Sequence, residues 1–236
     1  YPLEVENILL KNTAVAECSV VPFPHAIKGE VPVAMVVRSK TGAATTEDEL
    51  KKFCLANGPA YAHPRRIHFV DKLPLNAALL PLIYRLFPEA RIVLALRDPR
   101  DVVLSCFQQR FALNGAMYQL LRTDTAAAYY SAVMALVDKS RRLLPLQMHQ
   151  IRYEDVVAQF EVQIGNLLAF LDLPWDDAVR NHTETARRRV INTPSATQVV
   201  RPLYTSSVGK WRQYEPQLAP VLGMLAPWVA AFGYAD

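Results

Sequence analysis

Cysteine is scarce in this sequence, and the three cysteines that occur form neither a pair nor a cluster. Cys18, Cys54 and Cys106 lie far apart, and no two have the spacing of a CxxC motif. An odd, scattered set argues against a disulfide framework and against a zinc site. We therefore expect no bound metal and a reducing, cytoplasmic location.

Long runs of one charge are also missing. The 236 residues carry a net charge of +4, and the densest basic cluster is the triplet Arg187 to Arg189. This balance suits an anionic ligand but is too weak to indicate nucleic acid as a partner. The opening residues YPLEVENILL are interrupted early by acidic side chains, which argues against a signal peptide. Because the chain starts at Tyr1, we expect it to be part of a longer, multidomain protein.

One uncharged run, residues 218–235, has the length of a membrane span but not its composition. It contains two prolines and two glycines. Its larger apolar residues recur every three or four positions, the spacing of a helix that packs on one face. We predict a C-terminal helix and no membrane span.

The first third of the chain has the pattern of a small α+β unit. Two β-branched runs, VAECSVV and VPVAMVV, flank a turn-like segment and predict two strands. Thr46 and Glu49 form a capping box that predicts the start of a helix, and RRIHFV predicts a last strand. On its segments YPLEVE, VAECSVVPFP, KGEVPVAMVV and HPRRIHFVDKLP, this unit resembles the C-terminal subdomain of adenylate-forming enzymes, the acyl-CoA synthetase and ligase superfamily. The resemblance implies a terminal Gly-Lys, but here the string LPLN is followed by AALLPL, so we expect no adenylation chemistry.

The rest of the chain has a different pattern. Ala77 to Phe87 predicts an apolar helix, and RIVLAL (residues 91–96) predicts a parallel strand buried on both faces. A helix is expected from Pro99, another within residues 125–144, a second strand in HQIRYED, and a helix that continues through Leu171. Strands that alternate with helices indicate an open α/β layer.

The segment RDPRDVVLS, residues 97–105, is the clearest candidate site. Arg97 follows the predicted strand at its carboxyl end, where open α/β sheets bind ligands, and Ser105 comes eight residues later in the next helix. An arginine fork and a serine hydroxyl are both suited to a phosphate. An arginine that closes a strand can equally be a structural ion-pair residue, and the pattern leaves both interpretations open.

Residues from about 71 to 236 resemble the C-terminal part of sulfotransferases that use 3′-phosphoadenosine 5′-phosphosulfate (PAPS), most closely the tyrosylprotein and bacterial repeat-associated branch. The matching strings are DKLP, RDPRDVVLS, IRYEDVV, PSATQVVRP and VGKW. The resemblance implies a P-loop-like parallel sheet and PAPS as cofactor, with a small-molecule or peptide acceptor. It implies cofactor contacts for Arg97, Ser105, Tyr153 and Lys210, and catalytic roles in stabilising the leaving group for Lys72 and Ser195. Tyr153 also suits a core position, and Ser195 also suits a turn cap.

The family's first strand and its 5′-phosphosulfate loop are expected upstream of DKLP, and so is its general base. The adenylation-like unit stands there instead, so we expect an incomplete sulfotransferase domain. The string VDKLPLN fits both families, and the chain looks chimeric at this point, with units 1–76 and 77–236. The predicted function is sulfuryl transfer from PAPS to a hydroxyl or amine. The alternatives are a fragment of an acyl-CoA synthetase, or a non-catalytic remnant or module.

Overall fold

The computed structural model describes residues 2–112, 114–181 and 205–234. It confirms a mixed α/β fold, and it divides the chain into two compact units, residues 1–73 and residues 74–236. Ser195 and the triplet Arg187 to Arg189 lie outside the described residues.

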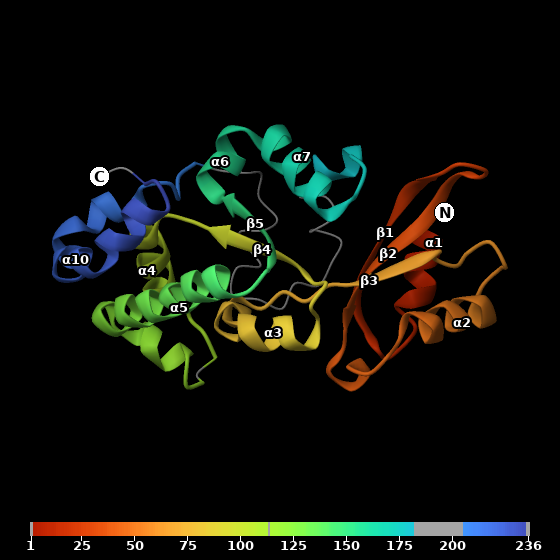
Figure 1. Ribbon diagram of the computed structural model, residues 1–236, viewed down its shortest axis with the longest axis horizontal. Helices are drawn as coiled ribbons and strands as arrows, with labels where there is room; N and C mark the ends of the chain where they lie inside the picture. Colours follow the sequence, from red (N-terminus) through yellow and green to blue (C-terminus); the bar gives the residue numbers. More distant parts are fainter. Residues whose placement is uncertain (1, 113, 182–204, 235–236) are drawn as a thin grey trace. The chain divides into compact units, whose positions relative to one another are not determined.

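The first unit is a three-stranded sheet backed by two helices (Figure 1). Its elements are α1 (Pro2–Leu9), β1 (Val15–His25), β2 (Gly29–Arg38), α2 (Glu47–Asn57) and β3 (Arg66–Phe69). The sheet has the order β1-β2-β3, with β1 antiparallel and β3 parallel to the central strand β2. Both helices pack with the sheet around one apolar core. The predicted helices and strands of this unit are confirmed.

The capping box at the start of α2 is present as predicted. The Thr46 hydroxyl accepts from the Glu49 backbone N–H at 3.3 Å, and the Glu49 carboxylate accepts from the Thr46 N–H at 2.9 Å. These bonds satisfy two donors that a helix start would otherwise leave unpaired. Cys18 and Cys54 are buried in this unit, and His68 is exposed on β3.

The second unit is built on a parallel pair of strands, β4 (Arg91–Leu96) and β5 (Gln147–Arg152). Its helices are α3 (Leu80–Leu86), α4 (Pro99–Gln108), α5 (Thr123–Leu143), α6 (Tyr153–Ala158), α7 (Phe160–Leu171) and α10 (Glu215–Ala231). Short 3₁₀ turns occupy Pro74–Leu79, Met117–Leu121, Asp177–Val179 and Lys210–Tyr214. Helices α3 and α5 lie on one face of the strands, and α6 and α7 lie on the other (Figure 1).

Two predicted helices begin or break elsewhere than expected. The helix predicted over Ala77 to Phe87 is α-helical only over Leu80–Leu86, because Pro81 lacks a backbone N–H and fits the first turn, and residues 77–79 belong to a 3₁₀ turn. The helix predicted through Leu171 is two helices, α6 and α7, separated by the non-helical Gln159 (φ −141°, ψ 57°). The C-terminal helix is present as α10, with Leu218, Val221, Leu225 and Val229 buried along one side. No helix within the described ranges is long and apolar enough to cross a membrane.

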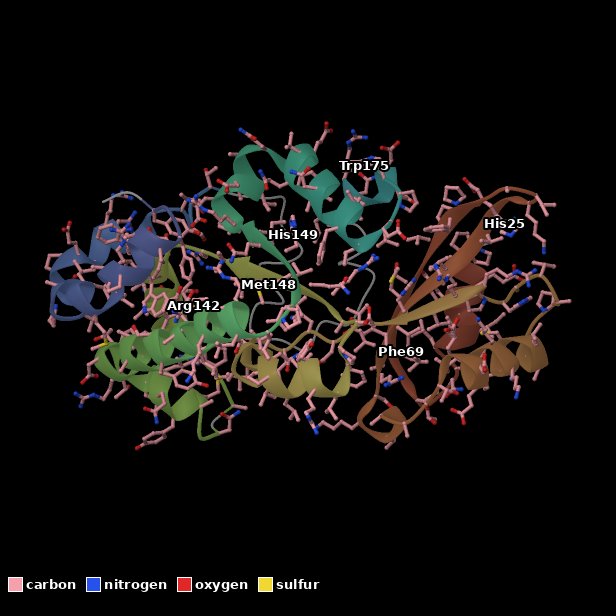
Figure 2. The ribbon with its side chains drawn as sticks, in the orientation of Figure 1. His25, Phe69, Arg142, Met148, His149 and Trp175 are labelled. Carbon is pink, nitrogen blue, oxygen red and sulfur yellow. The ribbon has the colours of Figure 1, made fainter. Side chains whose placement is uncertain are left out.

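The prediction that the strand over residues 91–96 is buried on both faces is wrong. Leu94 and Leu96 are buried against α3 and α5, whereas Val93 is 39% exposed and Ala95 is also exposed. Within the described part of the chain, the face of β4 that carries Val93 and Ala95 is only partly covered by packed side chains. The adjacent residues Met148 and His149 of β5, labelled in Figure 2, follow the same alternation: Met148 packs with the α5 core, and His149 stacks on Phe170 of α7 with ring centroids 5.3 Å apart.

Candidate functional site

The candidate site lies at the carboxyl ends of the two parallel strands. The register pairs Leu96 with Arg152, so the next residues, Arg97 and Tyr153, emerge side by side. Both leave their strands directly into a helix start: Asp98 caps α4, and Tyr153 opens α6. The Arg97 guanidinium lies over the Tyr153 ring, 5.5 Å from its centroid.

Helix α4 supplies one wall of the site. Counted from Asp101, the residues Leu104, Ser105 and Gln108 lie three, four and seven positions on, which places all four on one helical face. Together with Arg97, Gln109, Tyr153, Ser207 and Lys210 they line a pocket of about 210 Å³. The structure thus brings together all four residues predicted to contact the cofactor: Arg97, Ser105, Tyr153 and Lys210.

The two cations of the pocket are held mainly by uncharged acceptors. The Arg97 Nη2 donates to the Ser207 carbonyl at 2.5 Å, and its Nε is buried without a hydrogen-bond partner among the described residues. The Lys210 ammonium donates to Gln108 Oε1 at 2.9 Å. Because these contacts do not neutralise either cation, both retain capacity for an anion.

The pocket also contains one carboxylate that sequence reasoning missed, Asp101. It is 1% exposed, and it accepts hydrogen bonds from the backbone N–H groups of Gly209 at 2.7 Å and Trp211 at 2.8 Å. Its Oδ2 lies 3.9 Å from Arg97 Nη2, so the ion pair that the sequence left open is present but loose. Burial raises the pKa of Asp101, against the lowering effect of these two N–H donors and of Arg97.

Sequence spacing alone could have identified Asp101, since it lies four residues after Arg97 and four before Ser105. No sequence pattern could have identified the Ser207 carbonyl as a partner of Arg97. Every residue has a backbone carbonyl, and the two residues are 110 positions apart.

The second buried charged group next to the pocket is structural. Asp98 accepts from the Arg100 backbone N–H at 2.9 Å and from Arg100 Nε and Nη2 at 3.0 and 2.8 Å. Arg100 lies over the Trp211 ring, 4.0 Å from its centroid, and both side chains are buried. Trp211 is therefore a core residue.

Neither residue predicted to be catalytic is among the described residues that line this pocket. Lys72 is exposed and belongs to the first unit, one residue before its end. Ser195 lies outside the described residues. Their roles remain predictions. Within the described residues, no group of three or more His, Cys, Asp or Glu side chains could hold a metal ion.

Comparison with known proteins gives two kinds of similarity. A family model described as "Sulfotransferase family" matches residues 34–177. A protein-tyrosine sulfotransferase of Drosophila melanogaster is 24% identical over 221 residues, which are 89% of this chain and 43% of that protein. An uncharacterized protein of Aquifex aeolicus is 35% identical over 164 residues, 69% of this chain and 21% of that protein.

The other similarity is to acyl-CoA ligases. A 2-succinylbenzoate–CoA ligase of Geobacillus is 44% identical over 78 residues, 33% of this chain and 16% of the ligase. The chain therefore resembles two groups of enzymes, and it spans less than half the length of each of these three relatives.

Proposed function

The chain belongs to the sulfotransferase family, and from this premise we propose that its pocket binds the 3′-phosphate end of PAPS, the donor for sulfuryl transfer to a hydroxyl or amine of a small-molecule or peptide acceptor. The observation that carries this proposal is the convergence of Arg97, Ser105, Tyr153 and Lys210 in one pocket at the ends of parallel strands. Ligands of open α/β sheets bind at this place in the fold.

The residues of the pocket fit a phosphate. A guanidinium, an ammonium and a hydroxyl face one carboxylate, so donors and positive charge predominate. The buried Arg97 Nε has no hydrogen-bond partner among the described residues, which leaves a donor for an incoming oxygen. At about 210 Å³ the pocket is smaller than the roughly 300–1,000 Å³ typical of sites for whole drug-sized ligands. It therefore suits one end of a nucleotide.

The roles of the individual residues follow from their chemistry. The bound cofactor would supply an activated sulfuryl group on its 5′-phosphate. Arg97, Ser105 and Lys210 would bind its far end, and Tyr153 would lie against the nucleoside, so that binding energy remote from the reaction orients the reacting group. Lys72 and Ser195 are proposed to stabilise the negative charge that grows on the departing phosphate oxygen.

Isothermal titration calorimetry with two nucleotides tests this proposal. Adenosine 3′,5′-bisphosphate should bind more tightly than AMP, because only the bisphosphate carries a 3′-phosphate. Arg97→Ala should weaken bisphosphate binding by about 1.5–3 kcal/mol, the range for a charge-assisted hydrogen bond. Arg122→Ala, which removes an exposed arginine of the same unit, is the matched control and should change nothing. Equal affinity for the two nucleotides would refute the site.

The similarity to ligases supports a second proposal, on the first unit. We propose that residues 1–76 correspond to the C-terminal subdomain of an adenylate-forming enzyme, and residues 77–236 to the C-terminal part of a sulfotransferase domain. Asn76 is followed by Ala77 and Ala78 where the ligase pattern has Gly-Lys, so the unit should not support adenylation. Measurement of ATP–pyrophosphate exchange with a panel of carboxylic acids tests this, and exchange above background would favour the ligase alternative.

A further inference from the structure

The segment Ser207 to Trp211 contributes a carbonyl and a lysine to the pocket, yet it lies more than a hundred residues from α4 in the chain. Lys210 reaches Gln108 of α4 through its side chain, but the backbone N–H groups of the segment are attached to α4 through one side chain. The two carboxylate oxygens of Asp101 accept hydrogen bonds from the backbone N–H groups of Gly209 and Trp211, the residues before and after Lys210. The same carboxylate lies 3.9 Å from Arg97 Nη2.

We propose that Asp101 is the positioning residue of the pocket: it holds Lys210 through the backbone on both sides of it and orients Arg97 through charge. This inference rests on the proposed function only for the identity of the ligand. A single buried carboxylate thereby fixes both cations that would contact the phosphate.

The geometry favours positioning over direct contact with a ligand. Asp101 is 1% exposed, and both of its oxygens are already occupied by N–H donors. A carboxylate would also repel a phosphate, so its presence in an anion pocket needs another reason. Gly209 supplies part of that reason, since its left-handed backbone (φ 67°) turns the chain so that the N–H groups before and after Lys210 both face Asp101.

The loose contact with Asp101 also leaves hydrogen-bond donors of Arg97 for a phosphate. At 3.9 Å the Asp101 contact attracts the guanidinium without a hydrogen bond, and the Ser207 carbonyl receives Nη2. A tight bidentate pair would occupy the donors that a phosphate needs. Asp98 shows this contrast three residues earlier, because it binds Arg100 through two short hydrogen bonds and removes that arginine from ligand binding.

Asp101→Asn in the full chain tests the proposal, with Asp98→Asn as the matched control. Both changes neutralise a buried carboxylate in the same helix start, but only Asp101 contacts Gly209 and Trp211. The first readout needs no ligand: amide hydrogen exchange, followed by NMR. The Gly209 and Trp211 amides should be protected in the wild-type chain, and Asp101→Asn should speed their exchange by about tenfold or more, the loss of one charge-assisted hydrogen bond. Asp98→Asn breaks the pair with Arg100 and lowers the stability of the unit as a whole, so it should speed these two amides no more than the other amides of the second unit.

The second readout is the ratio of the affinities for adenosine 3′,5′-bisphosphate and AMP, measured on the folded fraction. Asp101→Asn should lower this ratio by about tenfold, whereas a general loss of stability would leave the ratio unchanged. If the wild-type chain shows no preference for the bisphosphate, the proposed function fails, while the exchange experiment still decides the role of Asp101.

A measurement on the wild-type chain covers the case in which Asp101→Asn does not fold. A positioned segment should have both amides protected before ligand is added. Protection that appears only with adenosine 3′,5′-bisphosphate would overturn the proposal. So would an Asp101→Asn variant in which the Gly209 and Trp211 amides exchange no faster, relative to the rest of the second unit, than they do in Asp98→Asn.

Discussion

The two units of this chain bury different kinds of side chain. Within the described residues, the first unit buries an apolar core and no charged side chain, whereas the second buries Asp98, Arg100 and Asp101 next to its pocket. Burial of a charge costs several kcal/mol unless it is paired, so a fold retains such groups where they also do something else. The comparison separates a unit whose buried residues are apolar from one that also buries charged side chains next to its proposed binding pocket.

The sheet of the first unit is also more completely paired and buried than the described sheet of the second. In the first unit, the central strand β2 is paired on both sides and contributes Val33, Ala34 and Val36 to the core. In the second, the described sheet is a single strand pair, and Val93 of β4 is 39% exposed. A two-stranded sheet with a partly exposed apolar face is a weak point of a fold. The second unit should therefore be the first to open.

The largest effect should come from Asp98→Ala, which removes the carboxylate that receives two hydrogen bonds from the buried Arg100 and one from its backbone. Breaking a buried pair from one side costs about 3–5 kcal/mol, because the remaining charge stays in a poorly solvated place. Urea denaturation should show this loss in the transition of the second unit, while the transition of the first unit stays in place.

The matched control for that experiment is Asp124→Ala. Asp124 binds Arg122 with nearly the same geometry, at 2.9 and 2.8 Å, but the pair is exposed. Solvent screens such a pair, so its removal should have a much smaller effect. Equal losses from the two variants would show that burial is not what distinguishes the Asp98 pair.

Truncation of one buried leucine in each apolar core should cause smaller losses of stability. Leu50 of the first unit and Leu225 of the second are both fully buried. Each change to Ala should cost about 2–5 kcal/mol, from lost burial and the cavity that remains. Each should shift only the transition of its own unit in urea denaturation monitored by circular dichroism, with exposed Leu55→Ala and Met224→Ala as controls. A common shift of both transitions by either core change would show that the units unfold together.

The parts of this comparison that the sequence could predict are local. The capping box of Thr46 and Glu49, the apolar spacing of α10 and the place of Arg97 at a strand end all depend on neighbours within a few residues. The contacts of Asp101 with Gly209 and Trp211 span more than a hundred positions, and no local pattern specifies them. The exposure of Val93 was missed for a related reason: an apolar run shows that a strand can be buried, but the distant elements that pack on its two faces decide whether it is.

The smallest effect should come from Thr46→Ala, at the exposed start of α2 in the first unit. Loss of an N-cap hydroxyl costs typically about 1 kcal/mol, because the Glu49 backbone N–H loses its acceptor. Urea denaturation of the first unit measures this loss, and Thr41→Ala, outside the helix, is its control.

The same cap should make the first unit sensitive to acid. The backbone N–H and the hydroxyl of Thr46 lower the pKa of Glu49 below its ordinary value of 4.5. A carboxyl whose pKa is lower in the folded than in the unfolded chain stabilises the fold above the unfolded pKa, and this contribution is lost as the pH falls through the folded pKa. Glu49→Gln keeps an acceptor for the Thr46 N–H but does not ionise, so it should flatten the dependence of stability on pH below about 4.5. An unchanged slope in that variant would assign the acid sensitivity to other carboxylates, with Glu47, whose pKa is also lowered, as the next to test.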